Sequence, residues 1–77
     1  MQTASEYWYE QRHTLCEGQM FRAVDGDIVK LDRTVPGDGT RWYVADWNNG
    51  WSYYDSTIEP SDLVERVWSE PSVSQVA

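Results

Sequence analysis

His13 and Cys16 are the two side chains of this sequence that could act as soft metal ligands or as nucleophiles, and they lie three residues apart. A structural zinc site takes four such ligands, whereas the sequence contains one histidine and one cysteine. Nucleophilic catalysis needs a base and an orienting group beside a thiol of low pKa, and no local pattern supplies them. We therefore expect Cys16 to be a buried small apolar residue and His13 to lie at the surface. The sequence predicts no catalytic residue, no metal site and no cofactor, and hence a protein that is not an enzyme.

Carboxylates recur where the chain turns. Asp25-Gly26-Asp27 has the composition of a calcium-binding loop, but the twelve-residue spacing and closing glutamate of an EF-hand are absent. Aspartates are also common in tight turns and on solvated faces. A second interpretation is that spaced carboxylates on a small rigid body imitate the phosphates of a nucleic acid and occupy a basic groove. The residues concerned are Asp25, Asp27, Asp32, Asp38, Asp46 and Asp55.

Aromatic residues form a dense group in the second half of the chain. They are Trp42, Tyr43, Trp47, Trp51, Tyr53 and Tyr54. A barrel as small as this chain can form has no room for six such rings inside, and Trp and Tyr are enriched in binding hot spots. We therefore expect some of them to form an exposed docking patch. The alternative is that they cap the core and pair across strands.

Strand alternation divides these rings between two faces. In the first of the two aromatic strands, Trp42 and Val44 share one face, and Tyr43 and Trp47 share the other. In the next strand, Trp51 and Tyr53 share a face, and Tyr54 points the opposite way. Alternation alone does not say which of the faces is exposed.

The charge balance limits the class of partner. Thirteen acidic residues stand against six basic ones, which gives a net charge of −7. A free-standing nucleic-acid binder usually presents a basic patch, because phosphate neutralisation supplies most of its affinity. An acidic domain fits a basic partner surface instead, or its acidity serves solubility alone.

No apolar run approaches the roughly 20 residues that a membrane span needs. The first residues also lack the basic and apolar regions of a signal peptide. We therefore expect a cytoplasmic protein with no membrane partner.

The elements expected to position these side chains are mainly β-strands. Thr3 and Glu6 fit a capping box, which predicts a short helix in residues 1–17, although Tyr7-Trp8-Tyr9 is a β-prone run. Tight turns are predicted at Asp25-Gly26 and at residues 48–50, and a helical turn at residues 59–63. Residues 34–40 contain proline and two glycines and are predicted to be a loop. The predicted strands are 19–24, 27–33, 41–47, 51–55 and 64–68.

These elements predict a mainly β fold with a small five-stranded barrel or curved antiparallel sheet over residues 18–68. The N-terminal segment 1–17 precedes it, and residues 69–77 are expected to be a flexible tail. The local patterns at Gly18-Gln19-Met20, residues 44–50 and residues 58–63 together resemble the SH3-like small barrels, including their KOW and Tudor-type relatives. The resemblance implies a module that binds peptides, modified tails, nucleic acid or protein surfaces. The KOW-type RNA binders tend to be basic, whereas this chain is acidic.

We therefore expect a non-enzymatic protein–protein interaction module that docks on a basic surface of its partner. The rings expected to make contact are Trp42, Tyr43, Trp47, Trp51 and Tyr54, and the steering carboxylates are Asp38, Asp46 and Asp55. In size, acidity and compactness the chain also resembles the small phage proteins that inhibit bacterial nucleases, including anti-CRISPR and anti-restriction proteins that act as DNA mimics. This resemblance implies a nuclease or a nucleic-acid-binding complex as the partner.

Two other functions fit the same sequence. A nucleic-acid-binding barrel would use Arg22, Arg33 and Arg41 for phosphates and the tryptophans as stacking platforms. Its binding would weaken steeply as salt rises. A structural or virion-assembly component would instead appear as a homo-oligomer.

Overall fold

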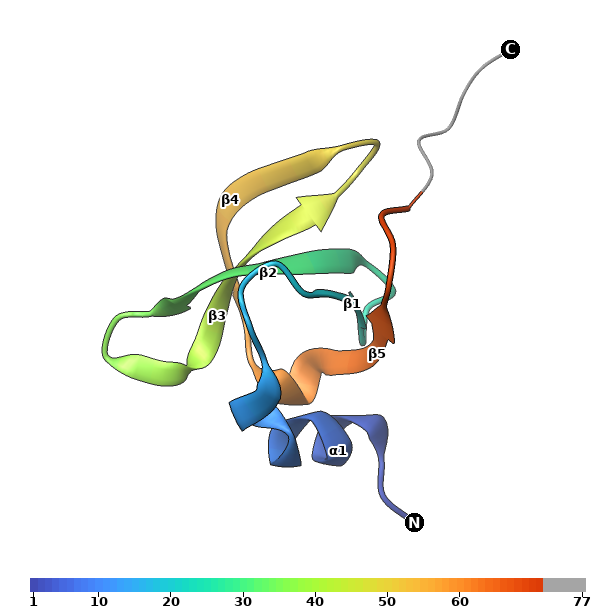
Figure 1. Ribbon diagram of the computed structural model, residues 1–77, viewed down its shortest axis with the longest axis vertical. Helices are drawn as coiled ribbons and strands as arrows, with labels where there is room; N and C mark the ends of the chain where they lie inside the picture. The colour runs from blue at the N-terminus through green and yellow to red at the C-terminus, as the bar shows by residue number, and fades with distance from the viewer. Residues whose placement is uncertain (72–77) are drawn as a thin grey trace.

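Four strands follow one another as antiparallel hairpins, and the last strand returns to pair with the first (Figure 1). The computed structural model describes residues 1–71, apart from the side chains of Tyr54 and Asp55. Within this range there is one five-stranded sheet in the order β4-β3-β2-β1-β5. The elements are α1 (Ala4–Glu10), η1 (Arg12–Thr14), β1 (Met20–Ala23), β2 (Ile28–Val35), β3 (Asp38–Trp47), β4 (Trp51–Ile58), η2 (Pro60–Asp62) and β5 (Leu63–Val67). The predicted mainly β fold, with a curved antiparallel sheet and a short N-terminal helix, is confirmed. Of the predicted tail, residues 72–77 lie outside the described residues.

The helix α1 forms because its first turn is capped from both sides. The Thr3 hydroxyl accepts a hydrogen bond from the Glu6 backbone N–H at 3.1 Å, and the Glu6 carboxylate accepts one from the Thr3 N–H at 3.5 Å. This capping box outweighs the β propensity of the aromatic run that follows. Trp8 then attaches the helix to the sheet. Its ring packs edge-on against Phe21 at 4.8 Å between centroids, and its indole N–H donates to the Val64 carbonyl at 3.0 Å.

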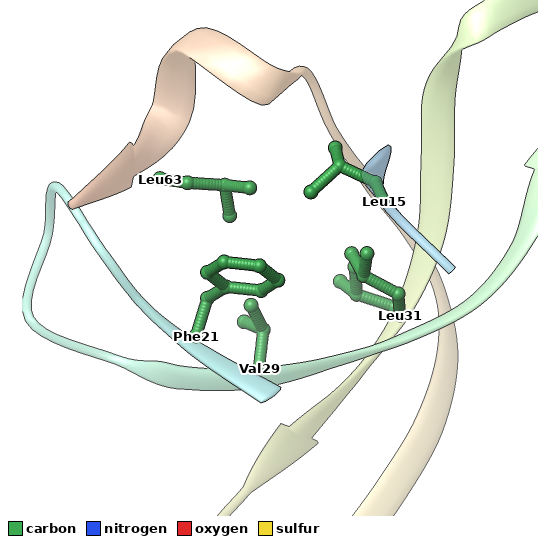
Figure 2. Packing of buried hydrophobic residues seen from close by; sticks show 6 residues of the cluster. Leu15, Phe21, Val29, Leu31 and Leu63 are labelled. Carbon is green, nitrogen blue, oxygen red and sulfur yellow. The ribbon is translucent and has the colours of Figure 1, made fainter. Parts of the chain in front are cut away.

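The core is a single cluster of six side chains between the curved sheet and the segment that follows α1 (Figure 2). Its members are Leu15, Phe21, Val29, Leu31, Val44 and Leu63, with Trp8, Trp42 and Ile58 packed against them. Six buried residues make a small core, so each contributes a large share of the apolar burial that stabilises the fold.

The residues just before the sheet correct one prediction. Leu15 points into the core, and the adjacent Cys16 is exposed rather than buried. Both residues lie where the chain leaves η1 toward β1, and Leu15 takes the inward position. His13 is exposed, as predicted.

The connection between β2 and β3 is shorter than the predicted loop at residues 34–40. The strands continue to Val35 and resume at Asp38, which leaves a two-residue turn of Pro36 and Gly37. Gly37 has φ of +83°, the left-handed conformation that a glycine adopts without strain at this position of a turn. The β2–β3 register shifts between Leu31 and Arg33 and between Thr34 and Val35, and the pairing continues beyond each shift. The turn predicted at residues 48–50 is present, with Asn49 at φ of 56°.

We expect the Trp8→Phe substitution to lower the free energy of unfolding by about 1–3 kcal/mol, because it removes the hydrogen bond to Val64 and part of the packing on Phe21. Urea denaturation followed by circular dichroism measures this change. The matched control is Tyr7→Phe in the same helix, which removes only a hydroxyl from a side chain that is 46% exposed. Equal stability of the two variants would show that Trp8 does not attach α1 to the sheet.

Candidate functional site

The side of β3 and β4 that faces away from the core carries an aromatic cluster. Trp47 and Trp51 are cross-strand partners, with their ring centroids 5.1 Å apart in an edge-to-face arrangement. The Lys30 ammonium lies 4.5 Å from the Trp51 ring centroid and 5.9 Å from that of Tyr53. We call these four residues, Lys30, Trp47, Trp51 and Tyr53, the aromatic face.

The register of three strands assembles the aromatic face. Ala45 of β3 pairs with Lys30 of β2 on one side and with Tyr53 of β4 on the other. Ala45 points away from the core, since its neighbour Val44 points inward. It is nevertheless fully buried, between its cross-strand partners Lys30 and Tyr53. Tyr53 remains 62% exposed, and Trp47 and Trp51 are half-buried. The face therefore offers ring surface that a partner can still cover.

A hollow of about 390 Å³ adjoins the aromatic face and shares Trp47 with it. We call it the acidic hollow; its lining is Asp27, Asp46, Trp47, Asn48 and Ser52. Asp46 lies between Val29 and Ser52 in the register of the sheet. Burial raises the pKa of the Asp46 carboxyl, and the charges of Asp27 and Asp25 raise it further. The hollow thus concentrates negative charge beside exposed tryptophan surface, which suits a positively charged group of a partner.

The remaining predicted site residues lie elsewhere. Trp42 packs against the core cluster, and Tyr43 lies beneath the Arg33 guanidinium, which is 4.7 Å from its ring centroid. Asp38 lies at the start of β3, where it accepts hydrogen bonds from the hydroxyl and the backbone N–H of Thr40. These bonds, with the nearby Arg41 charge, hold the pKa of Asp38 below its ordinary value.

The structure therefore brings together three of the predicted residues, Trp47, Trp51 and Asp46. The side chains of Tyr54 and Asp55 lie outside the described part of the chain. Sequence reasoning did not include Lys30 and Tyr53 in the site. Alternation had placed Tyr53 on the face of Trp51, so that signal was present, whereas the position of Lys30 depends on strand register.

Every basic side chain already has an intramolecular partner among the described residues. Arg22 pairs with Glu65 at 3.0 Å, and Arg41 pairs with Glu59 at 3.1 Å and with Asp38 at 3.8 Å. The other cations lie over aromatic rings: Arg12 over Tyr9, Lys30 over Trp51, Arg33 over Tyr43 and Arg66 over Trp68. Within the same part of the chain, the ion pairs involve three carboxylates. Most of the acidic side chains that the structure describes are therefore not neutralised by an ion pair.

A second hollow, of about 300 Å³, lies between α1 and η2 and is lined by Ser5, Glu6, Tyr9, Glu10 and Ser61. Its two glutamates are engaged locally, since Glu6 caps α1 and Glu10 accepts a hydrogen bond from Gln2 at 2.6 Å. Among residues 1–71, as far as their side chains are described, no three His, Cys, Asp or Glu residues are grouped so as to hold a metal ion. In the same range, no helix has the length and apolar character to cross a bilayer.

Comparison with protein-family models, with curated proteins and with solved structures found no match. The fold and the side chains of the aromatic face and acidic hollow are therefore the basis for a functional proposal.

We expect Asp46→Asn to raise the free energy of unfolding at pH 7, by less than about 1 kcal/mol because solvent screens a partly exposed charge. A carboxyl whose pKa is raised in the folded state destabilises the fold as pH rises through that pKa, because the unfolded chain ionises more readily. The gain should therefore be present at neutral pH and disappear below the ordinary value of 3.8, where both states are protonated. Urea titrations between pH 3 and pH 7, roughly the range in which carboxyls ionise, measure it.

The control for that series is Glu17→Gln, which neutralises an exposed carboxylate outside the acidic hollow. A gain of the same size and pH dependence in both variants would mean that net charge alone is responsible, and that Asp46 has no special environment.

Proposed function

We propose that this chain is a non-catalytic protein-binding module that docks on a basic surface of its partner through the aromatic face and the acidic hollow. The observation that carries the proposal is the position of Trp47, which belongs to both. Apolar ring surface and concentrated negative charge therefore adjoin at one place. This combination fits a partner surface in which a lysine or arginine lies beside apolar groups.

The two parts of the surface have different roles in binding. Full burial of an aromatic side chain removes roughly 150–250 Å² from water, and Trp47 and Trp51 have already lost part of that area to each other. The exposed Tyr53 ring therefore contributes the largest new burial. The carboxylates contribute mainly to the association rate and to partner choice, because exposed charges steer encounters more than they add affinity.

The proposal includes the assignment of this chain to the SH3-like small barrels. Five strands joined mainly by tight turns support it. The short 3₁₀ turn η2 also supports it, since it lies directly before β5 within residues 58–63, one of the stretches that resemble such barrels. The role that best fits the charge distribution is a small phage-type inhibitor, of the anti-CRISPR or anti-restriction kind, that imitates a nucleic acid. Carboxylates without ion-pair partners among the described side chains, such as Asp27 and Asp46, support that role.

Direct nucleic-acid binding is less well supported by the same side chains. Arg22 and Arg41 already pair with carboxylates, and Arg33 lies over the Tyr43 ring. A phosphate would compete with the ion pairs of Arg22 and Arg41, and the net charge of the chain opposes the approach of an anion.

We expect Trp47→Ala and Trp51→Ala each to weaken partner binding at least about tenfold, the loss typical of a ring at the centre of an interface. The partner is isolated by affinity capture from a lysate of the cells in which the protein acts, and the purified pair is then measured by calorimetry. Tyr9→Ala is the control, because Tyr9 is an aromatic residue that is 49% exposed on α1, outside the aromatic face. Full affinity in both tryptophan variants, with folding verified by circular dichroism, would contradict the proposal.

We expect a fluorescently labelled single-stranded oligonucleotide to show no anisotropy change with this protein at low salt, because the phosphates meet a net negative surface. When the oligonucleotide is first bound to the captured partner, addition of this protein should displace it. Tight direct binding that is lost steeply as salt rises would favour the nucleic-acid-binding alternative. Binding of the partner without displacement would contradict nucleic-acid mimicry and leave the docking proposal standing.

A further inference from the structure

The chain that follows β5 crosses to the opposite edge of the sheet. Figure 1 shows it leaving β5 and rising beside the hairpin between β3 and β4. There the Glu70 carboxylate accepts a hydrogen bond from the Trp51 indole N–H at 3.1 Å, a contact between residues nineteen positions apart. Pro71, the next residue, is half-buried although it belongs to no strand or helix. The segment after β5 therefore contacts the aromatic face through Glu70, while Trp68 and Ser69 remain exposed.

This contact links β4 to the segment that follows β5. β4 and β5 are the two ends of the strand order, and they do not pair with each other within the described residues. The Lys30 ammonium lies 4.5 Å from the centroid of the Trp51 ring, and the Trp51 indole N–H donates a hydrogen bond to the Glu70 carboxylate. A cation and a carboxylate of the same chain thus contact this ring.

We propose that residues 68–71 form a strap, latched by Glu70 onto Trp51, that covers part of the aromatic face and is displaced when a partner docks. The proposal rests on the function proposed above, because it concerns access to the same ring. The Glu70–Trp51 bond lies at the surface, where water can replace it, so the strap opens at little cost. The bond from Trp8 to the Val64 carbonyl is part-buried and attaches α1 to β5, so it belongs to the permanent fold.

The latch is tested by nuclear magnetic resonance on the full chain, without any partner. We expect Glu70→Ala to move the Trp51 indole N–H signal, assigned with Trp51→Phe, and to speed its hydrogen exchange roughly two- to tenfold, as loss of a modest hydrogen bond predicts. The Trp8 indole signal should remain in place and serves as an internal control. Glu17→Ala, which removes an exposed carboxylate elsewhere, should leave both signals unchanged. An unchanged Trp51 signal in Glu70→Ala would overturn the latch.

The covering role is tested with the neutral dye Nile red, whose emission rises on apolar surface. We expect Glu70→Ala, and a chain shortened to end at Val67, to bind more dye than the wild type, and Trp51→Ala to remove the increase. If the latch opens and dye binding does not rise, the strap covers nothing and the proposal is wrong.

The captured partner separates this result from the docking proposal. If the strap competes with the partner for Trp51, Glu70→Ala should bind the partner roughly two- to tenfold more tightly than the wild type. This is the factor expected when one hydrogen bond no longer has to be broken. Affinity that is unchanged in Glu70→Ala but lost in Trp51→Ala would reject the strap alone. Affinity unchanged in both would reject docking on Trp51.

Discussion

Strand β3 is buried on both of its faces at Val44 and Ala45, and the rest of the structure depends on this double burial. Val44 is 2% exposed on the core side, and the adjacent Ala45 is fully buried on the opposite side. A chain of 77 residues cannot build two cores. On the second face, Ala45 lies between its cross-strand partners Lys30 and Tyr53, which have long side chains. Tyr53 nevertheless remains 62% exposed.

Local chemistry explains what could be predicted from the sequence. The capping box at Thr3, the turn residues and the alternation of apolar residues act over a few positions, so the helix, the turns and the inward faces follow from them. The composition of the site depends on register between strands that are distant in sequence. Lys30 lies over the Trp51 ring because of the pairing between strands. Glu70 contacts the same residue because of the course of the chain after β5. No local sequence pattern encodes either contact. The prediction that Cys16 is buried was wrong for a related reason. Tertiary packing places the adjacent Leu15 in the core and leaves Cys16 exposed.

The distribution of charge gives this small fold an unusual surface. Cations are held over rings or in ion pairs, where they shield aromatic surface from water, as Arg33 does over Tyr43. Among the described side chains, Asp46 and Asp27 have no such ion pair, and both face one hollow although their mutual repulsion opposes it. In the proposed docking, these two carboxylates beside Trp47 are the groups that meet a cation of the partner.

Exposed rings and net charge together explain how such a surface can stay selective. Half-buried tryptophans attract apolar groups of any protein, including other copies of this chain. Two copies that each carry a charge of −7 repel one another. An acidic protein or a nucleic acid is repelled by this chain in the same way. In the proposed docking, a basic surface meets no such barrier, and a cation placed in the acidic hollow would bring its apolar neighbours onto Trp47. Under this proposal, discrimination comes from repulsion of unsuitable partners, and the rings supply affinity once the correct partner is in contact.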